Sequence, residues 1–304
     1  MRIAVHGQQA FGKAVLEKLL ERNEDVVAVF CAPGKEGRPQ DPLAALAEEK
    51  GLPLHQPKSW KTDEALKLMA DAKPDVCMMA YVTLFVPQNA LDVPTHGTFQ
   101  YHPSLLPLHR GPSSINWPII QGATKTGLTI FWPDEGLDEG PILLQKEVEI
   151  GPDDTLGSVY FNHLFPMGVD AMLEALDLVR DGKAPKIPQD DSKATYESWC
   201  RKADAEIDWS KPTADVYNLI RGCDPQPGAW TTRNGTEVQI YDSRRGEGSG
   251  APGTVLGVSG DSVRVATADG AIAIKRVRPQ GGGKVAVSDW VSEAGVKQGD
   301  KLGG

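Results

Sequence analysis

The 304-residue sequence has few cysteines and no surplus of positive charge. Its four cysteines are widely spaced and form no C-x-x-C pair, which argues against a zinc site or a disulfide framework. We therefore predict free thiols and no metal site. Cys31 and Cys77 lie in or beside apolar runs, so we expect both thiols to be buried.

The net charge is −9, and all of it falls on residues 1–205, because residues 206–304 carry equal numbers of acidic and basic side chains. Neither part of the chain is basic. A partner bound mainly through its phosphate backbone, such as tRNA, is therefore not favoured. A local basic patch stays compatible with these totals.

Long apolar runs are also missing, since none approaches the roughly 20 residues that cross a bilayer. The first residues, MRIAVHG, are typical of a strand, and no long apolar segment follows them, so no signal peptide is predicted. We expect a cytoplasmic protein that does not bind a membrane. The hydrophobic content of 40% is enough for an ample core.

The first half of the chain alternates between short apolar runs and amphipathic segments. Strands that are apolar throughout and separated by helices predict a mostly parallel sheet covered on both faces, an α/β fold. The predicted strands are 2–6, 25–30, 74–81, 97–102 and 127–132, and the predicted helices are 11–21, 42–51 and 64–73.

The second half changes class. A long helix is predicted over 155–181, with Asp154 or Thr155 as its N-cap and a bend or break at Pro166. A polar segment over 183–193 and a helix near 212–222 follow. From about residue 228, short strands separated by Gly, Asp and Asn predict a small all-β domain of the barrel type. We place the boundary between domains 1–203 and 204–304.

The turn after the first strand, GQQAFGKAV, contains Gly7 and Gly12 but lacks the G-x-G-x-x-G spacing of a dinucleotide site. It is not a P-loop either, because Ala14 stands where Ser or Thr would bind magnesium. We predict that the two glycines serve close packing of strand and helix and that no nucleotide binds here.

His102 ends the apolar strand GTFQYH and precedes a Pro-rich loop. The carboxyl ends of parallel strands border the ligand crevice of such sheets, and a histidine there is suited to proton transfer. The alternative is a structural histidine bonded to the loop backbone. Gln100 lies on the same face of the strand, where its amide could donate to an oxyanion or satisfy nearby backbone groups.

Asp138 lies in the acidic turn DEGLDEG after the next strand. The ligand spacing of a calcium-binding EF-hand is missing there, so the alternatives are an ordinary turn or a partner for His102. Neighbouring strand ends could bring the two side chains together, and a carboxylate beside an imidazole fixes its orientation.

These motifs, YHPSLLPLHRG and GLDEG, resemble the formyltransferases that use 10-formyltetrahydrofolate, and the resemblance extends over nearly the whole chain. It includes AYVTLFVP, ATYESWCRKADAEIDW and IRGCDPQPGAW. Within the family, the N-terminal hydrolase domain of 10-formyltetrahydrofolate dehydrogenase is most similar, and methionyl-tRNA formyltransferase is more loosely similar.

The resemblance implies a Rossmann-like domain without a nucleotide, followed by an OB-like barrel. It implies a catalytic set of Asn-x-His with the Asp of G-L-D-x-G, which His102 and Asp138 match and Gln100 does not. It also implies a folate pocket formed by Met79, Ala80, Tyr81 and Phe85, with Leu106 and the 134–138 turn, which contains Glu135 and Gly136, opposite. Arg110 is expected to face either the ligand or an acidic neighbour.

Three functions follow from the resemblance. The first is hydrolysis of 10-formyltetrahydrofolate, with water as the formyl acceptor. The second is transfer to an amine, which could belong to methionyl-tRNA, an amino sugar or another small molecule. The third is a folate-binding module without catalysis. The chain ends at Gly304 without a dehydrogenase domain, so a full fused enzyme is not expected. The sequence leaves open whether it is a fragment, and its oligomeric state.

Overall fold

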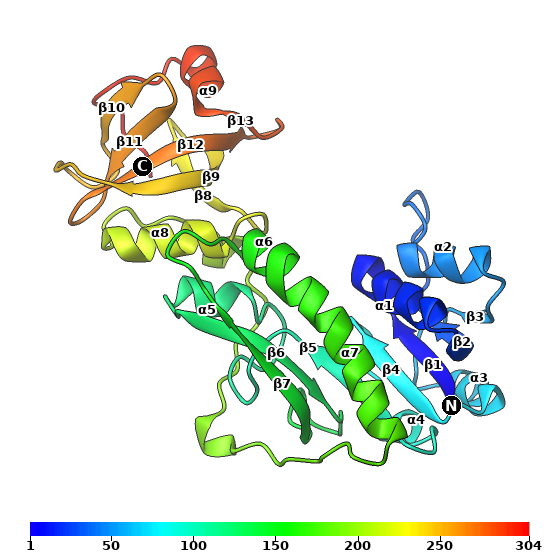
Figure 1. Ribbon diagram of the computed structural model, residues 1–304. Coiled ribbons are helices and arrows are strands. Elements are labelled where there is room, and N and C mark those ends of the chain that lie inside the picture. Colours follow the sequence, from blue (N-terminus) through cyan, green and yellow to red (C-terminus); the bar gives the residue numbers. More distant parts are fainter. Residues whose placement is uncertain (304) are drawn as a thin grey trace. The chain divides into compact units, whose positions relative to one another are not determined.

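A computed structural model of the chain describes residues 1–303 (Figure 1). Its internal contacts divide it into two compact units. The first comprises residues 1–111, 127–147 and 163–196, and the second comprises 112–126, 148–162 and 197–304. The two units are not separated by a single cut in the chain, because two segments before residue 203 belong to the second unit. The domain boundary at 203/204 therefore stays a prediction.

The first unit is built on a sheet with the strand order β3-β2-β1-β4-β5-β6-β7. Strands β1 to β5 are parallel along this order, whereas β6 is antiparallel to β5. The predicted α/β class with a mostly parallel, Rossmann-like sheet is thus confirmed. The strands are β1 (Arg2–Gly7), β2 (Asp25–Phe30), β3 (Leu54–His55), β4 (Val76–Ala80), β5 (Thr98–His102), β6 (Lys125–Phe131) and β7 (Ile142–Glu149).

Helices cover both faces of this sheet (Figure 1). On one face α1 and α7 pack together, and the Phe11 ring stacks on Tyr101 with 4.3 Å between centroids. On the other face Trp60 and Met69 join the apolar side chains of the strands in a buried cluster. The helices of this unit are α1 (Gln9–Glu21), α2 (Pro42–Glu49), α3 (Asp63–Ala72), α4 (Gln88–Leu91) and α7 (Phe165–Arg180).

The helix predicted over 155–181 is interrupted, as Pro166 indicated. It consists of α6 (Leu156–Val159), one π-helical turn (Tyr160–Leu164) and then α7. Pro166 lies in the first turn of α7, directly after the π-helical turn, and its missing N–H cannot continue the hydrogen-bond pattern of that turn. Of the two predicted caps, the Thr155 hydroxyl accepts a hydrogen bond from the backbone N–H of Ser158.

The second unit contains an antiparallel sheet with the order β10-β11-β12-β9-β8, and β13 pairs with β12. This confirms the predicted all-β sheet; the C-terminal helix α9, which packs Trp290 into its core, was not predicted. The elements are α5 (Asn116–Ile120), α8 (Thr213–Gly222), β8 (Ala229–Arg233), β9 (Thr236–Gly246), β10 (Val255–Ser259), β11 (Ser262–Ala266), β12 (Ala271–Pro279), β13 (Val285–Ala286) and α9 (Val287–Ala294). In residues 1–303 no helix is long and apolar enough to cross a membrane.

Gly12 of α1 supports the predicted packing of strand and helix, because a methyl group there would lie 3.4 Å from the carbonyl carbon of Gly7. Gly7 instead allows close packing of two strands, because its added methyl group would lie 2.3 Å from the carbonyl oxygen of Ala80 in β4. We expect Gly7→Ala to lower the free energy of unfolding by about 1–3 kcal/mol or more, since two backbones would have to move apart. Urea denaturation measures the change. Gly34→Ala is the matched control, because nothing lies within 4 Å of its added methyl group. Equal losses in the two variants would contradict the packing role.

Candidate functional site

His102 ends β5 and is 5% exposed. Its Nε2 lies 2.9 Å from the carbonyl oxygen of His109. A carbonyl only accepts hydrogen bonds, so Nε2 is assigned as the protonated nitrogen and Nδ1 faces the other way. The predicted alternative of a contact to loop backbone is therefore present, and it coexists with the contact described next.

Asp138 is 7% exposed, and its Oδ2 lies 3.6 Å from Nδ1 of His102. This separation is longer than a hydrogen bond. The same Oδ2 accepts a hydrogen bond of 2.8 Å from the backbone N–H of Gly111. With Nε2 protonated in the neutral ring, Nδ1 and Oδ2 are both acceptors, so a hydrogen bond between them forms only when one of the two groups carries an additional proton. The structure thus brings the two side chains together in a geometry suited to sharing a proton.

The path by which the two residues meet differs from the expected one. Because β6 runs antiparallel to β5, its carboxyl end lies beside Gln100 rather than beyond His102. The loop over 132–141 turns back, and the N–H of Trp132 bonds to the carbonyl of Pro141. Asp138 sits in this loop at φ 59°, an uncommon conformation for a residue with a side chain.

Gln100 pairs with Met79 of β4 on one side and with Phe131 of β6 on the other. Its half-buried side chain lies on the same face of β5 as His102, and Tyr101 lies on the opposite face. Within residues 1–303 its amide has no hydrogen-bond partner. The amide is therefore available to a ligand.

The predicted pocket residues divide into buried and exposed groups. Met79, Ala80 and Leu106 are buried, and the N–H of Leu106 donates to Thr129, which pairs with His102. Tyr81 and Phe85, in the segment after β4, are 47% and 61% exposed. Exposed aromatic rings near the carboxyl ends of strands offer a surface for a flat ligand. Glu135 and Gly136 lie in the 132–141 loop, where the N–H of Gly136 donates to Asp134.

Arg110 is buried, and its guanidinium is occupied by polar neighbours. Its Nε and one terminal nitrogen lie 3.1 and 2.9 Å from Oε1 of Gln189, and the same terminal nitrogen lies 2.6 Å from Asp191. Of the two roles expected for Arg110, the structure shows pairing with an acidic neighbour, Asp191. Its assignment to folate binding stays a prediction.

The turn predicted not to bind a nucleotide contains a carboxylate from elsewhere in the chain. The backbone N–H of Gln9, at the start of α1, donates to both side-chain oxygens of Asp41, at 3.0 and 2.9 Å. A helix N-terminus is the place where a phosphate would bind. Asp41 would repel it. In the described part of the chain no group of His, Cys, Asp or Glu is arranged to hold a metal.

Two buried cysteines and one buried histidine near the sheet are unsuited to proton transfer at neutral pH. Burial raises the pKa of the Cys31 and Cys77 thiols to about 12 and lowers the pKa of His6 to about 3. The neutral His6 ring accepts a hydrogen bond from Trp60 at 3.4 Å. Of the histidines at the sheet's carboxyl edge, His102 is thus the candidate for catalysis.

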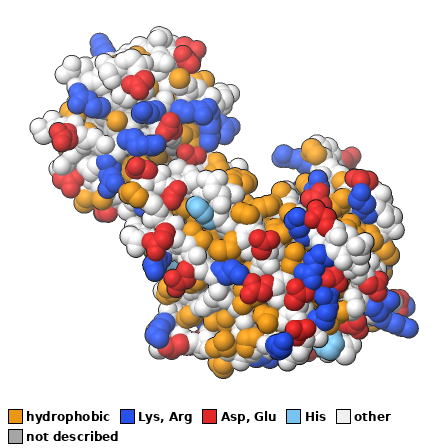
Figure 2. Space-filling view, in the orientation of Figure 1, with side chains coloured by type: hydrophobic (Ala, Val, Ile, Leu, Met, Phe, Trp, Pro, Cys, Tyr) orange, Lys and Arg blue, Asp and Glu red, His pale blue; other side chains and the backbone are white. Residues whose placement is uncertain are grey.

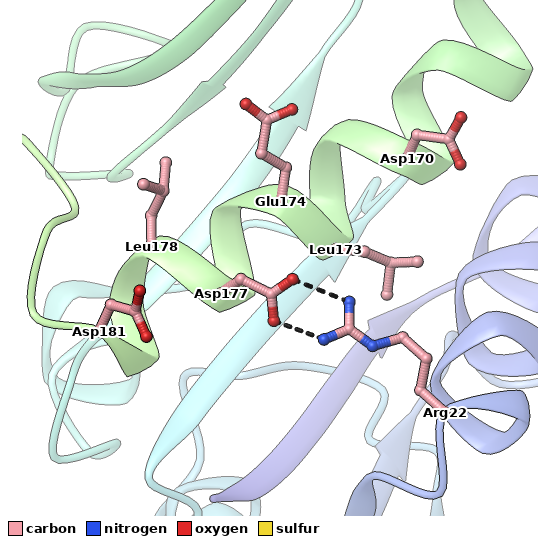
Figure 3. A pocket seen from close by; sticks show the side chains of 7 residues that line it. All are labelled: Arg22, Asp170, Leu173, Glu174, Asp177, Leu178 and Asp181. Atoms are coloured by element: carbon pink, nitrogen blue, oxygen red, sulfur yellow. Dashed lines mark hydrogen bonds and ion pairs between the residues drawn. The ribbon is translucent and has the colours of Figure 1, made fainter.

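A surface hollow of about 370 Å³ lies on α7, and its lining contains none of the predicted site residues (Figure 3). Arg22, which points into it, is paired with Asp177. Its remaining polar side chains are carboxylates, so it would repel an anionic ligand. The residues that line it are Arg22, Asp170, Leu173, Glu174, Asp177, Leu178 and Asp181.

Comparisons with known proteins agree with this architecture. Residues 1–176 match the formyl transferase family, and residues 200–295 match the C-terminal domain of formyl transferases. The chain belongs to the formyl transferase family. It is 43% identical over 265 residues to human mitochondrial 10-formyltetrahydrofolate dehydrogenase, covering 86% of this chain and 29% of the human protein.

A second relative is similar over the full length of both chains. Methionyl-tRNA formyltransferase of Geotalea daltonii is 37% identical over 308 residues, which cover 100% of this chain and 98% of that protein. Among solved structures, HypX from Aquifex aeolicus in complex with tetrahydrofolic acid has a TM-score of 0.69 at 22% identity, covering 96% of this chain and 47% of that one. The chain spans less than a third of the length of the human dehydrogenase described above.

The sequence did not identify Gln189 as part of the site. Its Nε2 donates to the carbonyl oxygens of Asp138 and Gly140, both at 2.8 Å. It lies in the polar segment predicted over 183–193, whose composition is typical of a linker. No spacing within that segment indicated a contact with a loop 51 residues earlier.

Proposed function

We propose that this enzyme transfers the formyl group of 10-formyltetrahydrofolate to water, giving tetrahydrofolate and formate. The observation that carries the proposal is the buried pair of His102 and Asp138 at the carboxyl edge of the sheet in a chain of this family. The choice of water rests on the 43% identity to a dehydrogenase and on the net charge of −9.

In the proposed reaction, Asp138 accepts a proton from a water molecule as its oxygen attacks the formyl carbon. His102 in its protonated form donates from Nδ1 to the oxygen of the tetrahedral intermediate, because its Nε2–H is held by the carbonyl of His109, and the amide of Gln100 donates to the same oxygen. The intermediate then breaks its bond between carbon and N10, and N10 takes up the proton that Asp138 accepted from the water molecule. No metal or nucleotide enters this sequence.

The proposed folate pocket lies along the segment after β4. The exposed rings of Tyr81 and Phe85 would cover the pterin, and Met79, Ala80 and Leu106 would form the apolar floor. Glu135 and Gly136 of the 132–141 loop would bound the opposite side. We expect the enzyme to act in the cytoplasm.

Transfer to an amine is the second candidate, and one surface favours it. Lys and Arg side chains gather on one face of the C-terminal β domain (Figure 2). Among the exposed basic side chains of this domain, Arg276 and Arg278 lie two residues apart on β12 and therefore point to the same side of that strand. Such a face would suit an anionic acceptor such as methionyl-tRNA, the substrate named for the Geotalea relative.

The deciding experiment is incubation with 10-formyltetrahydrofolate in the absence of any amine. Catalytic release of formate and tetrahydrofolate supports hydrolysis. No release, followed by turnover after methionyl-tRNA or an amino sugar nucleotide is added, replaces water with that acceptor. Tight binding of folate without turnover under any of these conditions identifies a binding module instead.

Gln100 provides a second test of the acceptor. Gln100→Asn restores the residue of the family pattern and shortens the amide by one methylene. If the length of Gln100 places its amide correctly for the reaction with water, the variant should hydrolyse 10-formyltetrahydrofolate at least about tenfold more slowly. Complete loss of one hydrogen-bond donor to an oxyanion costs about 10²–10³ in rate, and the shorter Asn amide should lose part of that. Rates of formate release, measured with Gln56→Asn as the control on a distant exposed amide, decide this. Equal rates would exclude a role for the length of Gln100.

A further inference from the structure

Residues 185–196, which follow α7 after a short connection, form hydrogen bonds with both loops of the site. We call residues 185–196 the strap. Trp132 donates to the carbonyl of Pro185 at 2.9 Å, and Ile187 forms two backbone hydrogen bonds with Ile142. These contacts fix the first part of the strap against both ends of the loop that contains Asp138.

The far end of the strap contacts the other loop of the site. The N–H of Thr195 donates to Pro107, and the N–H of Arg110 donates to the carbonyl of Thr195 at 3.0 Å. The Thr195 hydroxyl also accepts from the N–H of His109 at 2.8 Å. The strap thus contacts the loop whose His109 and Gly111 bond to His102 and Asp138.

Gln189 joins the two loops between these ends. Its Nε2 donates to the carbonyls of Asp138 and Gly140, and its Oε1 accepts from two nitrogens of Arg110. One amide therefore makes four hydrogen bonds, two to each loop. Asp138 needs such support because it is held at a positive φ, a conformation that persists only where the surroundings impose it.

We propose that Gln189 is a positioning residue that holds the Asp138 carboxylate at its working distance from His102. It does not touch the reacting atoms. It fixes the backbone of Asp138 directly, and through Arg110 it fixes the neighbouring Gly111, whose N–H binds the Asp138 carboxylate. A displacement of about 1 Å in a catalytic group can cost about 10²-fold in rate. The expected loss in rate rests on the proposed function. The expected loosening of the two loops rests on the hydrogen bonds alone.

The test compares Gln189→Glu with Gln189→Ala. Glu has the same shape and still pairs with Arg110, but it cannot donate to the two carbonyls in the 132–141 loop. We expect both variants to lose about 10- to 10²-fold in kcat, with KM for 10-formyltetrahydrofolate changed less than about threefold. A role confined to stability would instead leave kcat of the well-packed Glu variant near wild type. Gln56→Ala is the control, because its amide also donates to a carbonyl, that of Ala32, away from both loops.

Hydrogen–deuterium exchange gives a second readout that needs no activity. Peptides covering 107–112 and 133–141 should exchange faster in both Gln189 variants, and the amide of Gly111 should lose protection. The Gln56→Ala variant should match wild type in both. Unchanged exchange together with kcat within about threefold of wild type would overturn the proposal. If wild type transfers formyl to no acceptor, the proposed function fails, and the exchange result still decides whether Gln189 holds the loops.

Discussion

Asp138→Asn should lower kcat for formyl release by about 10²–10⁴-fold, the range expected for a lost general base. The amide oxygen of Asn can still accept the hydrogen bond from Gly111, and Asn tolerates the positive φ at this position. The loop should therefore keep its shape while the group that takes the proton is removed. KM for 10-formyltetrahydrofolate should change little, because the proposed pocket residues are untouched. Steady-state formate release measures both constants.

The matched control is Asp170→Asn, which makes the same chemical change in the hollow on α7. Its kcat should stay within about threefold of wild type. An Asp138→Asn variant with wild-type kcat would exclude proton abstraction by this carboxylate, whichever acceptor the enzyme uses. Loss of activity accompanied by a large rise in KM would instead indicate a role in binding.

Acid should destabilise the first unit in part through His6. Burial lowers its pKa from 6.5 to about 3, so the folded protein keeps the ring neutral while the unfolded chain protonates it below pH 6.5. Stability is therefore fully present above pH 6.5 and is lost as the pH falls towards 3. At about 1.4 kcal/mol per pH unit, the loss reaches roughly 5 kcal/mol over this window.

Urea denaturation at several pH values tests this, with His6→Gln as the comparison. The variant should be less stable near pH 7 and lose less stability between pH 6.5 and 4. Carboxylates titrate over part of this range in both proteins, so the difference between their slopes isolates His6. Parallel slopes would show that the unfolding equilibrium does not depend on protonation of His6.

The sequence predicted the apolar strands and the helices of the first unit because their periodicity reflects local burial. It also predicted that His102 and Asp138 would meet, yet for an incomplete reason. The prediction treated β6 as another parallel strand, whereas hydrophobic pattern carries no information about strand direction. The two residues meet because the 132–141 loop turns back, with Asp138 at a positive φ.

The supporting residues could not be predicted for a different reason. Gln189 and Thr195 act through hydrogen bonds to backbone atoms in loops that lie 49 to 86 residues away along the chain. Backbone groups are the same at every residue, so no partner type appears in the sequence to pair with them. The C-terminal helix α9 was not predicted, because the run KVAV at its start has the composition of a strand.

The carboxylate of Asp41 determines what this scaffold can be made to bind. It accepts the N–H of Gln9 at the start of α1 and that of Leu43 in α2, so one side chain supplies the negative charge for the first turns of two helices. Restoring a glycine-rich fingerprint in the preceding turn would leave that charge in place. Redesign toward a nucleotide cofactor would have to begin at residue 41, with a second cap found for α2.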